Sequence, residues 1–241
     1  MVNWQKTYIE KNIDLIEENR WEEFFHDDDK YGAGMGNIIQ EAGISFLPYL
    51  NEIPRRAFDS SKITELIIPE NIICIGEQAY IHCHDLVDVV LPPTIEKIEE
   101  MAFAFCRSLK SIDLPSSVKT LEMGAFTGCS SLEVVSLSSA LEKIPGLCFR
   151  SAKKLSTIDI PSSVTEIGFS AFKECSSLRD VNIPSSIIKI GNTAFSDCSQ
   201  LNINYGGTRE DWKNLILTGE KIFLHTKYVC TCTDGVVKKS R

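Results

Sequence analysis

The residues with the greatest chemical potential in this 241-residue sequence are two small groups of histidine and cysteine. The run "HCH" at 82–84 offers three side-chain types that zinc accepts. Cys83 belongs to a repeated column of inward positions, so the flanking histidines must point elsewhere. In "CTC", Cys230 and Cys232 share one face of a predicted strand, but His225 has the opposite parity and two thiolates cannot close a zinc site. An edge-strand cysteine pair, open to alkylating reagents, is favoured over a metal or redox role.

Two further stretches resemble ligand-binding motifs without meeting their requirements. "HDDDK" at 26–30 lacks the spaced oxygen ligands and the distal glutamate of a calcium loop. "GAGMG" at 32–36 does not lie between a strand and a helix, as a dinucleotide-binding fingerprint must. None of the four histidines lies near a serine or cysteine in an arrangement that would activate a nucleophile. The sequence therefore predicts no catalytic residues, no metal, no cofactor and no enzyme.

The composition of the chain indicates which classes of binding partner and which cellular compartment to expect. The formal net charge of −8 disfavours nucleic acid and anionic membranes, which both attract an excess of Lys and Arg. No apolar run approaches the length of a membrane span, and "MVNWQKTYIEKNIDLIEENRWEEFF" has no apolar core of a secretory signal. Nine cysteines are too sparse for a disulfide scaffold. These features predict a cytoplasmic protein with reduced thiols.

One phrase recurs every 23 residues through the middle of the chain. It reads "LPPTIEKIEEMAFAFCRSLKSIDLP" at 91–115 and "IPSSVTEIGFSAFKECSSLRDVNIP" at 160–184, and a 22-residue version begins at Ile53. Its fixed columns are prolines at 69, 92, 115, 161 and 184, leucines at 86, 109, 132, 155, 178 and 201, an alanine–aromatic pair starting at 79, 102, 125, 171 and 194, and cysteines at 83, 106, 129, 175 and 198. Ser138, Cys148 and Ala152 fill the slots that break these columns. Self-similarity at a fixed period of this length predicts a solenoid.

Each repeat predicts one coil that buries its apolar face only by stacking on its neighbours. In the coil that starts at Leu109, "LKSIDLP" predicts a short strand closed by proline, and "SSVKTL" predicts a second extended piece. "EMGAFTGC" then predicts a helical turn with Ala125, Phe126 and Cys129 inside. The cysteine is interpreted as a small apolar filler of a tight corner, because Ala152 replaces it in one coil.

The phrase "IPxxVxxIGxxAFxxCxxLxxVxIP" resembles the BspA-type, or Treponema pallidum-type, leucine-rich repeat over about residues 53–205. The resemblance implies a right-handed α/β solenoid used for protein binding, often on bacterial surfaces. Glu99, Glu122 and Pro145 replace the glycine of this pattern, and Ser138 replaces its proline. We expect these departures to alter turn geometry in the middle coils without altering the fold.

Both ends of the array need a cover for the exposed apolar coil. Residues 1–50 carry helically spaced apolar positions and predict a helical N-terminal cap, with a separate binding module as the alternative. After the repeats, Thr208 and Asp211 have capping-box spacing, and "KIFLHTKYVCTCTDGVV" predicts a strand with an Asp-Gly turn. The predicted domains are the cap at 1–50, a solenoid of about seven 22–23-residue repeats at 51–205, and a helix-plus-strand cap at 206–241.

The candidate binding surface consists of the outward residues of the first strand in each repeat. One ladder is Glu65, Asp88, Ser111, Val134, Thr157, Asp180 and Asn202, and its neighbour is Ile67, Val90, Asp113, Ser136, Asp159, Asn182 and Asn204. The two ladders hold five carboxylates and no Lys or Arg, with an apolar end at Ile67 and Val90. This concave face is either an ordinary solvated sheet or a docking surface for a basic protein.

The sequence thus favours a non-catalytic protein–protein interaction module, an intracellular scaffold or inhibitor of bacterial or phage origin. The alternative is a bacterial surface protein of the adhesin type, exported by a route that the sequence does not reveal. The partner, the biological process and the oligomeric state are left open.

Overall fold

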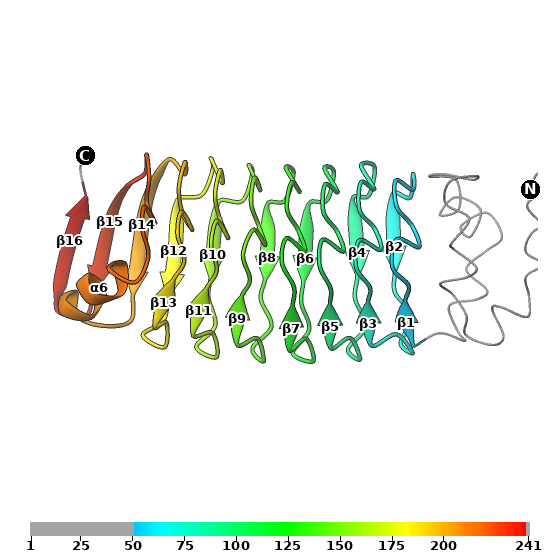
Figure 1. Cartoon of the computed structure of the whole chain (residues 1–241), viewed down its shortest axis with the longest axis horizontal. Helices are drawn as coiled ribbons and strands as arrows, with labels where there is room; N and C mark the ends of the chain where they lie inside the picture. The colour runs from blue at the N-terminus through cyan, green and yellow to red at the C-terminus, as the bar shows by residue number, and fades with distance from the viewer. Residues whose placement is uncertain (1–50, 240–241) are drawn as a thin grey trace, which may run out of the picture.

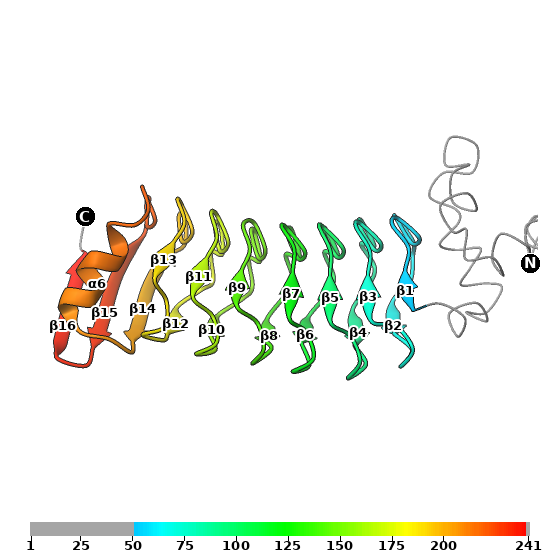
Figure 2. The same cartoon turned by 60° about the horizontal axis from the view of Figure 1, so that its bottom comes forward.

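The computed structural model describes residues 51–239 as a single stack of coils, with a short helix and two strands at its C-terminal end (Figure 1). The predicted N-terminal cap at 1–50 lies outside the described residues. About eight coils follow one another along the long axis, and strands from equivalent positions of the coils form two ribbons, with eight strands in the first and seven in the second (Figures 1 and 2).

The two ribbons are built of parallel strands that lie beside the equivalent strands of the neighbouring coils, and most but not all of these neighbours pair as hydrogen-bonded ladders. The first ribbon contains β2 (Glu65–Ile67), β4 (Asp88–Val90), β6 (Ser111–Asp113), β8 (Val134–Ser136), β10 (Thr157–Asp159), β12 (Asp180–Ile183), β14 (Gln200–Tyr205) and β15 (Lys227–Cys232). The second contains β1 (Glu52–Ile53), β3 (Cys74–Ile75), β5 (Lys97–Ile98), β7 (Thr120–Leu121), β9 (Lys143–Ile144), β11 (Glu166–Ile167) and β13 (Lys189–Ile190).

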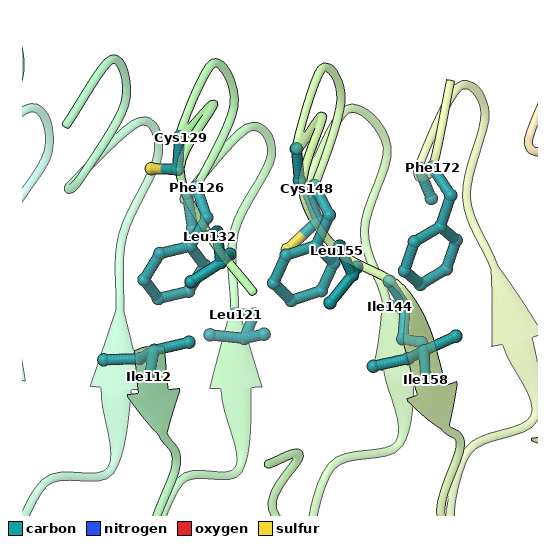
Figure 3. Close-up of a cluster of buried hydrophobic side chains, with 14 of the residues drawn as sticks. Ile112, Leu121, Phe126, Cys129, Leu132, Ile144, Cys148, Leu155, Ile158 and Phe172 are labelled. Carbon is teal, nitrogen blue, oxygen red and sulfur yellow. The ribbon is translucent and has the colours of Figure 1, made fainter. Parts of the chain in front are cut away.

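The repeat columns become rows of stacked side chains because strand pairing keeps the sequence period. Ile98 pairs with Leu121, and Ile112 with Val135, each 23 positions further along the chain. The inward members of these rows are almost completely shielded from solvent, as Ile112 and Leu121 are at 1% exposure. Figure 3 shows both, with the rings and leucines of the same coils pointing into the space between the ribbons.

A continuous pile of aromatic rings runs through the core. Consecutive ring centroids lie 4.9–5.7 Å apart, and their planes differ by at most 14°, from Phe58 through Tyr80, Phe103, Phe126, Phe149, Phe172 and Phe195 to Phe223. The sequence period identified the six middle rings. Phe58 and Phe223 extend the pile by one ring at each end.

The predicted helical turn at each corner is wrong: α6 (Arg209–Ile216) is the one helix among the described residues, and the corners are successive tight turns. Two left-handed residues per coil explain the difference. In one coil they are Met101 and Phe105, with φ of 53° and 61°, and in the next Gly124 and Gly128. A left-handed residue reverses the chain before a second helical turn can form.

Hydrogen bonds between coils compensate for these strained corners. The N–H of Met101 donates to the carbonyl of Met123, that of Phe103 to Ala125, and that of Phe105 to Thr127, at 2.7–3.0 Å. The same three donations recur in most coils. The corners therefore form a third hydrogen-bonded ladder beside the two ribbons.

The predicted C-terminal helix and strand both form. Thr208 caps α6 with the expected capping box to Asp211, and Trp212 is fully buried. β15 joins the first ribbon parallel to β14, and a turn at residues 233–234 leads into β16 (Gly235–Lys239), which runs antiparallel to β15.

Candidate partner-binding face

The two predicted ladders lie side by side on the outward face of the first ribbon, and we call these fourteen residues the outer strip. Strand register pairs Glu65 with Asp88 and Ile67 with Val90, and further ladders of the same ribbon, in contact with this one and with each other, carry the two rows on to Asn202 and Asn204. All fourteen residues are exposed, while the residue between each pair faces the core or lies partly buried. The structure thus brings the predicted residues onto one continuous surface.

The N-terminal end of the outer strip combines carboxylates with exposed aliphatic groups. Glu65 lies directly opposite Asp88, a like-charge pairing that costs stability in a sheet. No residue within 51–239 forms an ion pair with either carboxylate or with Asp113. Ile67 and Val90 beside them are 71% and 56% exposed. This end offers free negative charge next to apolar surface.

The C-terminal end of the outer strip is a hydrogen-bonded ladder of amides and carboxylates. The side-chain amide of Asn182 donates to Asp159, and that of Asn204 donates to Asn182 at 2.8 Å. In the adjacent ladder, Asn202 donates to Asp180 at 3.0 Å. The two carboxylates are therefore held in place with oxygen lone pairs still available to solvent or to a partner.

In the structure, the outward face continues over β15 and β16, which are not part of the predicted ladders. Asn202 pairs with Val229, which pairs with Lys238, and Gln200 pairs with Lys227. The outward surface therefore ends in lysines rather than carboxylates. The sequence does contain a sign of this. Tyr228, Cys230 and Cys232 alternate along the strand as inward residues would, which places Lys227 and Val229 on the outward face.

The "HCH" run builds a corner, not a ligand set. Cys83 is fully buried and its thiol donates to the carbonyl oxygen of Phe58 at 3.0 Å. His82 stacks on Phe105 with centroids 5.2 Å apart and lies 3.6 Å from a carboxylate oxygen of Asp59. His84 Nδ1 lies 2.9 Å from the carbonyl oxygen of Phe105. Within residues 51–239 no group of three His, Cys, Asp or Glu side chains could hold a metal ion.

The cysteines of the repeat column fill a tight corner, as expected, and they also form hydrogen bonds between coils. The thiols of Cys106, Cys129, Cys175 and Cys198 each donate to the carbonyl oxygen of the core aromatic residue one coil earlier, at 3.2–3.3 Å. Burial raises the pKa of Cys129 and of Cys198 to about 12, so both stay protonated at neutral pH. These thiols are structural and unreactive.

The prediction that Cys230 and Cys232 lie open on an edge strand is wrong. Both point to one face of β15, as expected, but they are 0% and 7% exposed, with sulfur atoms 3.7 Å apart. Helix α6 lies over this end of the sheet (Figure 2), and its Trp212 packs against Tyr228, which is on the same face of β15 as the two cysteines. Burial raises the pKa of Cys230 above its ordinary range.

A hollow lies on the other ribbon, beside the ends of β7, β9, β11 and β13. Its volume is about 480 Å³, and its walls include Phe169, Lys143, and an ion pair of 2.7 Å between Lys189 and Glu166. Gly168 also lines it, at a position where a Cβ atom would approach the backbone of Gly146 to 2.3 Å, so glycine is required there. The lining contains no histidine or cysteine.

Comparison with known proteins accounts for the period. The sequence pattern of the BspA type leucine rich repeat region matches residues 51–179 and 144–214, with six copies in the chain. The chain belongs to the BspA-type leucine-rich repeat family. A search of curated proteins found no match.

Solved structures of bacterial leucine-rich repeat proteins share the fold. A leucine rich cell surface protein from Faecalibacterium prausnitzii A2-165 is 27% identical, with a TM-score of 0.53 over 69% of this chain and 54% of that one. A protein from Bacteroides ovatus is 24% identical, with a TM-score of 0.51 over 66% and 53%. One from Eubacterium ventriosum is 17% identical, with a TM-score of 0.59 over 73% and 46%. The chain thus spans about half the length of these proteins.

Departures from the BspA-type pattern leave its backbone intact. Glu99 and Glu122 donate their N–H groups to the preceding coil at 2.9 Å, as Gly168 does at 2.8 Å. Ser138 is buried, and its hydroxyl accepts from the N–H of Ala140, which supports the turn that proline forms elsewhere. Pro145 has no N–H group to donate, so its coil lacks this hydrogen bond, while the stacking of the coils continues through it.

Leucine-rich repeat proteins generally bind protein partners on extended surfaces of stacked strands, and the fold is typically non-enzymatic. The family therefore identifies a protein-interaction or surface repeat module. Helix α6, the one helix among residues 51–239, is far too short to cross a bilayer.

Proposed function

We propose that this protein is a non-catalytic interaction module whose outer strip binds a partner protein with a basic surface. The observation that carries the proposal is the opposed pair Glu65 and Asp88, which are exposed and have no ion-pair partner within residues 51–239. Like charges facing each other destabilise a sheet, so a partner that neutralises them would recover that free energy on binding.

The rest of the strip supports the same partner. Asp113, Asp159 and Asp180 extend the negative charge along the ribbon, while Ile67 and Val90 add apolar area at one end. The Asn–Asp hydrogen bonds hold two of these carboxylates in place before binding, which lowers the entropy lost on association. The proposed recognition therefore combines electrostatic steering with a small apolar contact.

An intracellular scaffold or inhibitor is the role we favour, because all nine cysteines are free thiols and eight of them are buried in the hydrophobic core. The second candidate is a surface protein, since the Faecalibacterium prausnitzii relative is described as a cell surface protein. Protease treatment of intact source cells separates the two roles. Degradation of the protein on intact cells would support the surface role, and protection until lysis would support the intracellular one.

The strip itself is tested by crosslinking from defined positions. A photoreactive residue at Ser111 or Thr157, both on the strip, should crosslink the partner in source cells, whereas one at Glu142 or Glu220 should not. The crosslinked protein is then purified for binding measurements. Crosslinks formed only from the two control positions would overturn the proposal.

Charge removal then measures the electrostatic contribution. Changing Asp88, Asp113, Asp159 and Asp180 together to Asn should slow association and flatten its dependence on salt, because steering depends on the summed potential. Each exposed pair contributes only about 0–1 kcal/mol, so Asp159→Asn alone should have little effect. The matched control changes Glu70, Asp85, Glu142 and Glu220 to their amides, which alters net charge equally away from the strip. Equal association rates for both quadruple variants would exclude steering by the strip.

A further inference from the structure

The last strand of the molecule has a free edge. β16 pairs with β15, from Lys239 opposite Tyr228 to Gly235 opposite Cys232. No other strand among the described residues pairs with the far side of β16 (Figure 1). In an edge strand, alternate residues point their N–H and C=O groups outward without partners. Such an edge can hydrogen-bond another extended chain.

A pocket of about 190 Å³ opens at the corner of the sheet where β14 and β15 begin and β16 ends, so that it reaches the C-terminal end of the edge strand. The pocket is lined by three lysines, which are Lys227, Lys238 and Lys239. Gln200, Tyr228 and Val229 complete the lining. Its lining contains no Asp or Glu, although the whole chain carries a net charge of −8. None of the three lysines forms an ion pair with any residue of 51–239. The pocket is therefore a concentration of uncompensated positive charge in an acidic protein.

The register explains why the lysines meet there. Lys227 begins β15 opposite Gln200, and Lys238 lies opposite Val229, so both are on the outward face. Lys239 lies opposite the buried Tyr228, and its ammonium group donates to the carbonyl oxygen of Phe223 at 2.9 Å. The start of one strand and the end of the next thus bring Lys227 and Lys238 to the same face at one corner of the sheet, while the side chain of Lys239 points to the other face.

We propose that the free edge of β16 binds an extended, acidic peptide segment of a partner protein as an added strand, with one carboxylate side chain in the lysine pocket. The backbone edge supplies hydrogen bonds that a peptide satisfies and a simple anion does not. The pocket selects the charge of the added strand. This surface has the opposite sign to the outer strip, and the proposal does not depend on the strip's function.

The same lysines oppose a different use of the edge. Two copies of the chain pairing through β16 would bring their lysine pockets into one sheet, and charged edge residues are a common protection against such association. An acidic strand meets no such repulsion. The edge is therefore selective for acidic segments over a second copy of itself.

The test uses the full chain and a fluorescent eight-residue peptide of alternating Val and Glu. Its binding, followed by fluorescence anisotropy, should be about tenfold weaker for the Lys227→Gln/Lys238→Gln variant, since two partly exposed charge pairs are lost. The control variant, Lys110→Gln/Lys153→Gln, removes the same charge from exposed lysines elsewhere and should bind as the wild type does. Hydrogen exchange of the amides in Gly235–Lys239 should slow when the peptide is added.

Several results would overturn the proposal. The acidic peptide could fail to bind, or a Val–Lys peptide could bind equally well, and either result removes the charge selection. Binding without slower exchange at residues 235–239 would place the site elsewhere. Equal binding of a peptide methylated on its backbone nitrogens would exclude strand addition, and tighter binding of a single-stranded oligonucleotide to the same lysines would identify a polyanion site instead.

Discussion

The thiol of Cys129 donates a hydrogen bond to the carbonyl oxygen of Phe103, 3.2 Å away in the preceding coil. The cysteines at the same position of other repeats donate in the same way to the carbonyl oxygen of an aromatic residue in the preceding coil. The exception is the coil that carries Ala152 in place of the cysteine. There, Cys148 replaces the usual alanine four residues earlier, and burial, followed by the nearby Cys129 thiol, raises the pKa of its own thiol. Each of these coils thus keeps one buried thiol, although in one coil it comes from a different position in the repeat.

Exchanging these two residues should restore the common pattern. Cys148→Ala alone should cost about 1 kcal/mol of unfolding free energy, and Ala152→Cys alone about 1–3 kcal/mol through overpacking. The double variant should be close to wild type, with a favourable coupling of about 0.5–3 kcal/mol measured by urea denaturation. Additive losses would show that the two side chains do not share one space.

The protected thiols predict a loss of stability in alkaline solution. The ordinary pKa of cysteine is 9.0, and burial raises that of Cys129 and Cys198 to about 12. Below pH 9, both thiols are mostly protonated in the folded and in the unfolded protein. Between pH 9 and 12 the unfolded chain loses these protons and the folded chain does not, so stability falls as pH rises, approaching about 1.4 kcal/mol per pH unit for each thiol.

Urea denaturation from pH 7.5 to 10 checks this expectation. The Cys129→Ala/Cys198→Ala variant should have a shallower decline, whatever its stability at neutral pH. A decline identical to that of the wild type would mean that other groups, such as the buried Tyr80, dominate the alkaline transition.

Native thiol alkylation should modify one cysteine before the others. Cys74 is the one partly exposed cysteine, and burial together with nearby Glu99 raises its pKa to about 11, so its reaction should be slow at pH 8. All nine cysteines should react in urea. Mass spectrometry of tryptic peptides measures each site, and rapid native labelling of Cys106 or Cys175 would contradict the stacked core.

Two phenylalanines three residues apart provide a matched comparison of core and surface. Phe172 lies between two stacked rings, whereas Phe169 is 48% exposed on the rim of the hollow beside β11. Phe172→Ala should cost about 3–5 kcal/mol and produce partial unfolding, because contacts are mostly between neighbouring coils. Phe169→Ala should cost no more than about 1 kcal/mol. Similar melting curves for the two variants would show that the ring pile is not the core.

The repeat columns were enough to predict the coils, the core and the outer strip, because stacking converts a sequence period directly into rows of side chains. The same logic located Phe126 inside and Asp113 outside. It did not extend beyond the last regular repeat. The lysine end of the outward face was missed because β15 begins 27 positions after its partner β14, not 23.

The corners were predicted wrongly for a different physical reason. Left-handed conformations are expected of glycine, yet Leu147, Phe105 and Glu174 adopt them here. Hydrogen bonds from neighbouring coils, such as Glu174 N–H to the carbonyl of Ser196, favour a conformation that the residue alone would avoid. Local sequence carries no sign of that constraint. The burial of Cys230 likewise depends on α6, which is distant from the strand's own pattern.

The constant register has an evolutionary consequence. Ile98 and Leu121 occupy the same place in successive coils, so an in-frame duplication or loss of the gene segment between two such positions leaves every junction with familiar neighbours. An insertion of a few residues has no such compatibility, because it displaces the aromatic, cysteine and leucine rows together. The array can therefore change length by recombination in whole coils, and its outer strip lengthens or shortens with it while both ends are inherited unchanged.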